Sequence, residues 1–294
     1  MELRRTDLAL EAREMAGDSV PGVENEEAVK EGFFLNTVRV KTEEGARALG
    51  KPVGTYHTLD LAGVGRREEN AFPRAVAALA GILSPLLPQG KEEVLVVGLG
   101  NRAITPDAVG PKATDRTLVT RHLIELVPEH FGELRPVAAL AAGVLGTTGV
   151  ESGEIAKAVA DRLKPKAIIA IDALAARRVE RLCSTVQVCD SGIAPGSGVG
   201  NHRFALNEES LGVPVIAVGV PTVVDGATLC ADLLEETGKR ADPDALKKAS
   251  GATLIVTPRD IDQRVEDMAR IIGYAVSLAL QPGMGLEELE MLIE

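Results

Sequence analysis

Two apolar runs, each followed by an aspartate, constrain the fold of this chain more than any other feature. Residues 93–98 lead into a short turn that contains Asp107, and residues 167–171 lead directly into Asp172. Both runs have the length and the β-branched composition of strands that are buried on both faces of a parallel sheet. In such sheets, ligands and reacting groups gather beyond the carboxyl ends of the strands. The pattern therefore predicts that two carboxylates lie on the same edge of one sheet.

The rest of the chain predicts an α/β fold with a mostly parallel central sheet and helices on both faces. From residue 92 onward, apolar runs alternate with amphipathic stretches, and such alternation produces right-handed crossovers between parallel strands. The expected strands are 93–98, 136–142, 167–172, 185–190, 214–220 and 252–256. The expected helices are 71–87, 113–127, 151–163, 227–236 and 261–280. Residues 33–64 alternate apolar and polar positions, which predicts strands at the edge of the sheet.

The chain divides into an N-terminal arm and one large domain. Residues 1–32 are rich in charge and poor in periodic apolar positions, so we expect a weakly packed arm with one short helix. Residues 33–294 contain neither repeats nor a low-complexity linker. We therefore expect them to form a single α/β domain.

Composition excludes several classes of protein. The net charge of -11 argues against direct binding to a nucleic-acid backbone. Cys183, Cys189 and Cys230 have no C-x-x-C spacing, which is typical of reduced cytoplasmic thiols. No apolar stretch reaches the ~18 residues that a membrane span needs, and the charged N-terminus is unlike a signal peptide. The sequence therefore predicts a cytoplasmic protein without a membrane partner.

A glycine motif follows the first apolar run. Residues 98–103 fit the pattern G-x-G-x-x-A, which after a strand is typical of dinucleotide binding. That fold also needs an acid at the end of the next strand, and residues 136–142 end without one. Two interpretations stay open. The chain binds a nucleotide or small molecule as a sensor, or the glycines only allow the strand to turn sharply.

Each aspartate has a catalytic and a structural interpretation. Asp107 either complements the dipole of a following helix or is held on the functional edge of the sheet. Asp172 either pairs with Arg177 or Arg178, or it takes part in chemistry. Two neighbouring carboxylates share a proton and titrate as a unit, which supplies an acid and a base for the attack of water on a carbonyl.

Supporting residues are expected in two glycine-containing loops. The main-chain N–H groups of Gly198 and Gly200 are candidates for binding an oxyanion, although the loop is equally suited to a tight connection. Asn101 and His202 are further candidates for contacts that support the site. The remaining histidines, His57, His122 and His130, show no spacing of metal ligands. No serine lies in a G-x-S-x-G motif, so no serine or cysteine nucleophile is predicted.

Eight segments together carry a resemblance to a known family. They are residues 5–12, 97–101, 105–111, 118–123, 170–177, 190–193, 195–201 and 219–225. On these motifs, which extend over nearly the whole chain, the sequence resembles the endopeptidases that degrade small acid-soluble spore proteins when bacterial endospores germinate. The resemblance implies a fold akin to the hydrogenase-maturation endopeptidases, a homotetramer, and synthesis as a zymogen in the forespore, with persistence in the spore core.

The resemblance also implies roles for particular residues. The two essential aspartates of the family fall on Asp107 and Asp172. No cofactor is predicted as required. In the related maturation enzymes the corresponding acids bind a metal, so a bound metal ion stays an alternative here. The family removes its own propeptide at a site with an acid before the cut, followed by a large apolar residue and Ala. Here that site lies between Asp7 and Leu8, which gives a propeptide of seven residues, 1–7.

Overall fold

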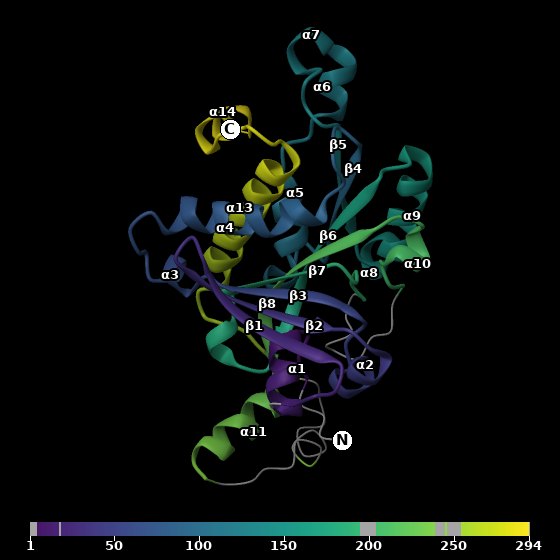
Figure 1. Ribbon diagram of the computed structural model, residues 1–294. Helices are drawn as coiled ribbons and strands as arrows, with labels where there is room; N and C mark the ends of the chain where they lie inside the picture. The colour runs from purple at the N-terminus through teal and green to yellow at the C-terminus, as the bar shows by residue number, and fades with distance from the viewer. Residues whose placement is uncertain (1–4, 18, 195–203, 239–244, 246–253, 294) are drawn as a thin grey trace.

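The computed structural model describes residues 5–17, 19–194, 204–238, 245 and 254–293, and within them one nine-stranded sheet organises the molecule (Figure 1). The strand order is β1-β2-β3-β7-β8-β6-β4-β5, and β9 pairs with β8. The strands are β1 (Val23–Lys30), β2 (Phe33–Val40), β3 (Gly54–Asp60), β4 (Val94–Leu99), β5 (Val137–Gly143), β6 (Ala167–Ala176), β7 (Thr185–Cys189), β8 (Val215–Asp225) and β9 (Ile255–Val256).

Parallel strands form the centre of the fold, which confirms the predicted α/β class. Strand β4 lies between β5 and β6, and β6 continues to β8, with all three pairings parallel. Strands β2 and β3 form the predicted edge, which β1 extends by one strand, with antiparallel pairings. Strand β7 runs antiparallel to β8. The link from β6 to β7, residues 177–184, is too short for the crossover that parallel strands require.

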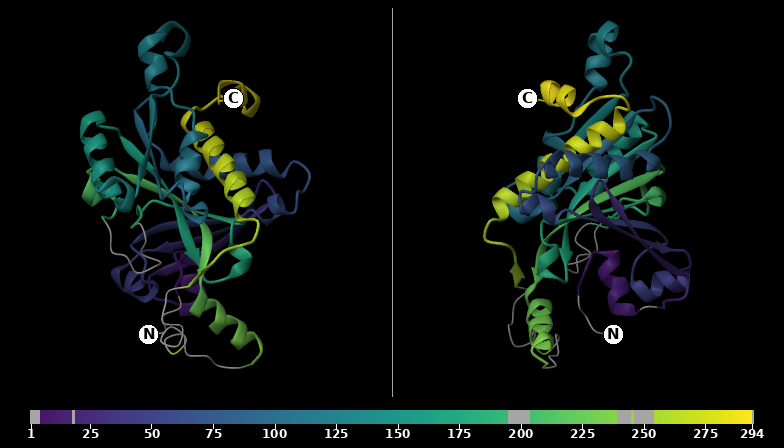
Figure 2. Two further views of the ribbon diagram at one scale, coloured as in Figure 1. Left: turned by 180° about the vertical axis from the view of Figure 1, so that it is seen from behind. Right: turned by 60° about the vertical axis from the view of Figure 1, so that its left-hand side comes forward.

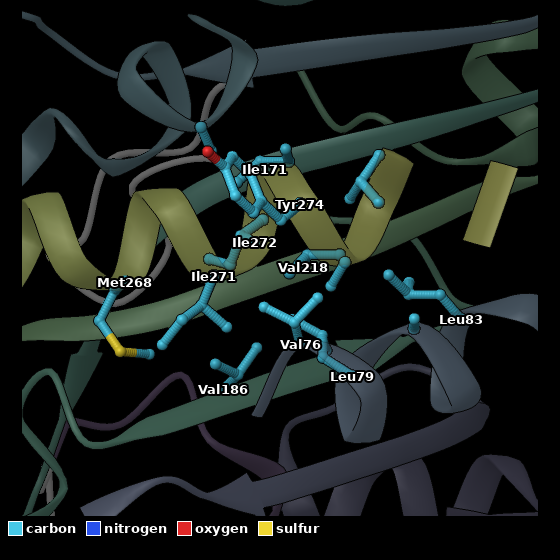
Figure 3. Packing of buried hydrophobic residues seen from close by; sticks show 14 of the residues in the cluster. Val76, Leu79, Leu83, Ile171, Val186, Val218, Met268, Ile271, Ile272 and Tyr274 are labelled. Carbon is cyan, nitrogen blue, oxygen red and sulfur yellow. The ribbon is translucent and has the colours of Figure 1, made fainter. Parts of the chain in front are cut away.

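Helices cover both faces because apolar side chains point alternately to each face. On one face, α4 (Ala71–Leu83), α5 (Val109–Asp115) and α13 (Ile261–Leu280) pack against alternate sheet residues. Figure 3 shows this core, where Ile171 and Val218 meet Ile272. On the other face, α9 (Ser152–Leu163) and α10 (Glu208–Leu211) cover a second cluster that contains Leu95 and Ile168. Helices α4 and α13 cross each other over the first face (Figure 2).

Shorter helices complete the described part of the chain. They are α2 (Glu43–Leu49), α3 (Ala62–Gly65), α6 (Arg121–Leu126), α7 (Pro128–Phe131), α8 (Leu145–Thr148), α11 (Gly226–Glu236), α14 (Leu286–Ile293) and the 3₁₀ turns Ser84–Leu86, Thr105–Asp107 and Val179–Arg181. None of the described helices is both long enough and apolar enough to span a bilayer.

The single helix predicted over 113–127 is wrong, since the chain forms two helices there. Helix α5 ends at Asp115 and α6 begins at Arg121. Between them, the Thr117 hydroxyl donates to the Ala113 carbonyl at 2.9 Å, and the Thr120 hydroxyl accepts from the amide of Val137 at 2.9 Å. These side-chain hydrogen bonds compete with the helix and attach the break to the start of β5.

The expectation of a weakly packed arm is also wrong for the described residues below 33. Helix α1 (Ala9–Ala16) packs against the sheet through Ala9 and Ala12, and Leu8 is fully buried. Strand β1 is acidic and largely exposed, so its sequence lacks the alternating apolar positions that predict a strand. It pairs along its whole length with β2. Cross-strand ion pairs such as Arg39–Glu26 stabilise the acidic side chains of β1. The described residues below 33 are therefore part of the fold.

Candidate active site

Both predicted aspartates line one cavity of about 670 Å³. The cavity lies on the sheet face opposite α4 and α13, because Asp172 alternates with Ile171, which packs under those helices. Its wall combines parts of β6, β7 and β8 with the Thr105–Asp107 turn and residues near the N-terminus. The structure therefore brings together the two acids that the sequence placed on one edge of the sheet.

Asp172 is held inside a strand and not at its end. Strand β6 continues to Ala176, and Asp172 is only 5% exposed. Its Oδ1 accepts a hydrogen bond from the amide of Ala173 at 2.9 Å. Next to it on β8 lies Gly219, where a Cβ would come within 2.4 Å of the Leu174 side chain. The glycine is needed because the Leu174 side chain folds over this position.

Asp107 is positioned by the turn that follows β4. Its Oδ2 accepts a hydrogen bond from the amide of Asn101 at 2.8 Å, and the Asn101 side chain accepts from the amide of Ala103 at 3.0 Å. Thr222 on β8 attaches the turn to the sheet, since its hydroxyl donates to the Pro106 carbonyl at 2.7 Å. Asn101 thus contacts Asp107 directly through its main chain, and its side chain stabilises the turn.

The glycine motif is explained by close packing of this turn. Gly100 has a φ of +111°, and a Cβ there would lie 2.0 Å from the Asp107 carbonyl oxygen. At Gly98, which lies against the start of α5, a Cβ would lie 2.4 Å from the Gly110 carbonyl oxygen. Other parts of the chain therefore fill the space beside each glycine of the motif, which accounts for the motif without a bound dinucleotide.

Arg177 and Arg178, the alternative ion-pair partners of Asp172, pair with other acids. Arg177 Nε lies 2.9 Å from an oxygen of Asp232, and Arg178 pairs with Glu236 at 3.4 Å. Arg177 is five residues farther along an extended segment than Asp172, which directs it toward α11. The ion-pair interpretation of Asp172 is therefore not supported by these contacts.

The chain's own N-terminal segment also lines the cavity. The amide of Asp7 donates to the Ala175 carbonyl at 2.8 Å, and the amide of Ala175 donates to Asp7 Oδ2 at 2.8 Å. Gln187 on β7 and Lys51, which follows α2, contact the same segment and also line the cavity. Sequence reasoning missed both residues. The one available signal for Gln187 was a polar residue within an apolar strand.

The other candidate residues do not add to the described site. Gly198, Gly200 and His202 lie outside the described residues. His57 lies on β3 with its Nδ1 3.0 Å from the Thr37 hydroxyl, and burial lowers its pKa. In the parts of the chain that are described, no three His, Cys, Asp or Glu side chains gather into a metal-binding group. Zinc normally takes three or four protein ligands, whereas magnesium is commonly held by one or two carboxylates with water completing its shell.

The buried thiols are poor nucleophiles. Burial raises the pKa of Cys183 to about 12 and also raises the pKa of Cys189, which lines the cavity. Cys230 is exposed on α11. The resemblance implies peptide cleavage without a thiol nucleophile, so we expect iodoacetamide to leave such cleavage unchanged, because thiols that stay protonated react slowly. The check is a peptide-cleavage assay with mass spectrometry of the modified protein and a Cys230→Ser control. Complete inactivation through Cys189 in a folded protein would contradict this prediction.

Buried Glu11 attaches the N-terminal helix to the sheet. It is 0% exposed and accepts hydrogen bonds from the amides of Arg177 at 2.7 Å and Arg178 at 3.0 Å. Burial raises its pKa, and these hydrogen bonds act in the opposite direction. We expect Glu11→Ala to lower the free energy of unfolding by about 2–5 kcal/mol, because two amides lose their acceptor. Urea denaturation tests this, with the more exposed Glu14→Ala as control. Equal small losses in both variants would contradict it.

Comparison with known proteins places the chain in a family. The sequence profile described as germination protease matches residues 3–237. A germination protease of Caldanaerobacter subterraneus subsp. tengcongensis is 44% identical over 98% of this chain and 98% of that protein. Those of Clostridium perfringens and Priestia megaterium are 41% and 36% identical, over 97% and 94% of this chain and 97% and 93% of their own lengths.

Among solved structures, the [NiFe] hydrogenase maturation protease HycI of Thermococcus kodakarensis aligns with a TM-score of 0.38 and 19% identity, over 66% of this chain and 98% of that chain. Family membership rests on the profile and on the sequence relatives, both of which extend over most of the chain. The chain belongs to the germination protease family.

Proposed function

We propose that this chain is an endopeptidase that begins the degradation of small acid-soluble spore proteins at germination, with Asp107 and Asp172 activating water. Membership of the germination protease family makes it a peptidase. The observation that carries the two-aspartate mechanism is that both acids line one cavity, which also holds an extended segment of polypeptide.

The proposed reaction needs one carboxylate and one carboxylic acid. The carboxylate removes a proton from water while the water oxygen attacks the carbonyl carbon of the substrate. The protonated partner then donates its proton to the amide nitrogen as the C–N bond breaks, which yields a carboxylic acid and an amine and leaves the two enzyme carboxyls with their protonation states exchanged. A pair that shares one proton supplies both groups. Asn101 would keep Asp107 oriented through its main-chain amide.

The resemblance supports the remaining parts of the proposal. The chain is made as a zymogen with propeptide 1–7, acts as a homotetramer, and resides in the cytoplasm of the forespore and in the dormant spore core. The cut lies between Asp7 and Leu8, where the sequence matches the pattern of an acid followed by a large apolar residue and Ala. Residues 6–9 are already bound beside the cavity, which is consistent with a segment that resembles substrate.

The test is cleavage of a purified small acid-soluble spore protein by the purified full-length chain, with and without EDTA. Mass spectrometry of the products should show cuts that follow an acidic residue. Loss of activity in EDTA that added metal restores would replace the two-acid mechanism by metal activation of water. No cleavage, combined with a rise in melting temperature on adding a dinucleotide, would favour the binding sensor.

A further inference from the structure

The segment Thr6–Ala9 is bound as a peptide would be, with its main chain held from two sides. On one side, the Asp7 amide donates to the Ala175 carbonyl of β6, and the Ala175 amide donates to the Asp7 side-chain Oδ2, both at 2.8 Å. On the other side, Gln187 and Lys51 contact the main chain. The arrangement shows which groups of the cavity recognise a polypeptide.

Gln187 binds the main chain on both sides of Leu8. Its Oε1 accepts from the amide of Ala9 at 2.7 Å, and its Nε2 donates to the carbonyl of Asp7 at 3.3 Å. A side-chain amide thus supplies the same donor and acceptor that a neighbouring strand would offer. Because main-chain groups are the same in every peptide, this contact positions a substrate regardless of its side chains.

Leu8 itself enters an apolar pocket. It is fully buried in a cluster with four sheet and turn residues, Leu174, Ala176, Leu182 and Val224. This pocket has the size and chemistry to accept a large apolar side chain after the cut.

Lys51 places a cation next to the residue before the cut. Its Nζ donates to the Thr6 carbonyl at 3.0 Å, one residue from Asp7, and both side chains line the cavity. Burial lowers the pKa of Lys51, and the charge of Asp7 raises it again. A buried ammonium gains from an acidic neighbour and would be destabilised by a basic one.

We propose that Lys51 and Gln187 form the peptide-binding subsite of this protease, in which Lys51 selects an acidic side chain before the cleaved bond and Gln187 positions the main chain around the residue after it. This inference rests on the proposed function. It adds two specificity residues that act on substrate without taking part in bond cleavage.

The first test compares peptides that differ only before the cut. Peptides of the form Arg-Thr-X-Leu-Ala-Leu-Glu, with Asp, Asn or Lys at X, are given to the chain after incubation at mildly acidic pH has allowed self-processing, and kcat/KM is measured. We expect the native chain to favour Asp over Asn by about tenfold or more. Lys51→Met should bring this ratio to about one, and Lys51→Glu should favour the Lys peptide. Lys157→Met, which removes an exposed lysine of α9, is the matched control and should keep the native ratio. An unchanged ratio in Lys51→Met would overturn the proposal.

The second test does not depend on proteolysis. In the full chain carrying Asp172→Asn, hydrogen exchange of the Asp7 and Ala9 amides reports how firmly the segment is bound. We expect Gln187→Leu to accelerate exchange at Ala9, and Lys51→Met to accelerate it at Asp7, each by about tenfold. Exchange in β4 should stay unchanged in both variants, which shows that the fold is kept.

Together, the two tests distinguish a failure of the proposed function from a failure of the proposed subsite. If the native chain cleaves none of the peptides but the variants accelerate exchange, the proposed function fails and the binding roles hold. If peptides are cleaved but neither selectivity nor exchange responds to Lys51 and Gln187, the subsite is wrong and the proposed function holds.

Discussion

Replacing Asp107 or Asp172 by Asn is expected to abolish proteolysis while the chain stays folded. Removing one member of an acid–base pair costs about 10²–10⁴-fold in rate. Asn has nearly the shape of Asp, and its carbonyl oxygen can still accept the hydrogen bonds from Asn101 and Ala173. The measurement is kcat/KM on a spore-protein substrate, with circular dichroism to verify the fold.

The double variant decides whether the two acids act as a unit. If both act on one water, Asp107→Asn combined with Asp172→Asn should be little slower than either single variant. Asp161→Asn, at an exposed position of α9, is the control and should keep full activity. Near-native activity in a folded Asp107→Asn or Asp172→Asn protein would show that the two-carboxylate mechanism is wrong.

Self-processing is expected to give a new N-terminus with the sequence Leu-Ala-Leu-Glu-Ala. The cut would separate Asp7 from Leu8, and N-terminal sequencing after incubation at mildly acidic pH would detect it. Acid favours the reaction because a carboxylate pair needs one proton to act as acid and base. The Asp172→Asn protein should stay full length. We therefore expect the native chain to be processed and the variant not to be processed at all.

The bound position of the segment affects how this cleavage proceeds. Asp7 is held at Ala175 of β6, the strand that also carries Asp172, and both side chains line the same cavity. We expect the segment to be cut either within its own chain or in another copy of the chain, and the dependence of the rate on protein concentration distinguishes the two routes. Processing between copies would accelerate with protein concentration, whereas processing within one chain would not.

Cleavage is also expected to change the structure around α1. Leu8 is fully buried, and its amide donates to the Thr6 hydroxyl at 3.0 Å. After the cut, that nitrogen becomes a charged amine, which is costly to leave in an apolar pocket. The new terminus should therefore move toward water and leave the pocket open for substrate. A mature N-terminus at another residue would contradict the proposed specificity, and cleavage by Asp172→Asn protein alone would contradict the catalytic assignment.

Local sequence determined the central strands and the two acids. The apolar runs of β4 and β6 need burial on both faces, and the 20 residues of α13 repeat apolar positions at helical spacing, so both signals lie within short windows. The prediction that the two acids lie near each other follows from parallel strands, but the predicted edge position is wrong for Asp172, which lies within β6. For the same reason, the cavity between them could be anticipated from sequence.

Only the tertiary structure decided what surrounds those acids. The break between α5 and α6 depends on Thr120 meeting β5, and the burial of Leu8 depends on strands more than 160 residues away. Lys51 and Gln187 are far apart in sequence, and only the pairing of β3 with β7 brings their segments together. The spacing of apolar residues within a helix or strand indicates which of its sides is buried, but not which other element packs against that side. Contacts between distant segments, which build the peptide-binding side of the cavity, arise only when the sheet assembles.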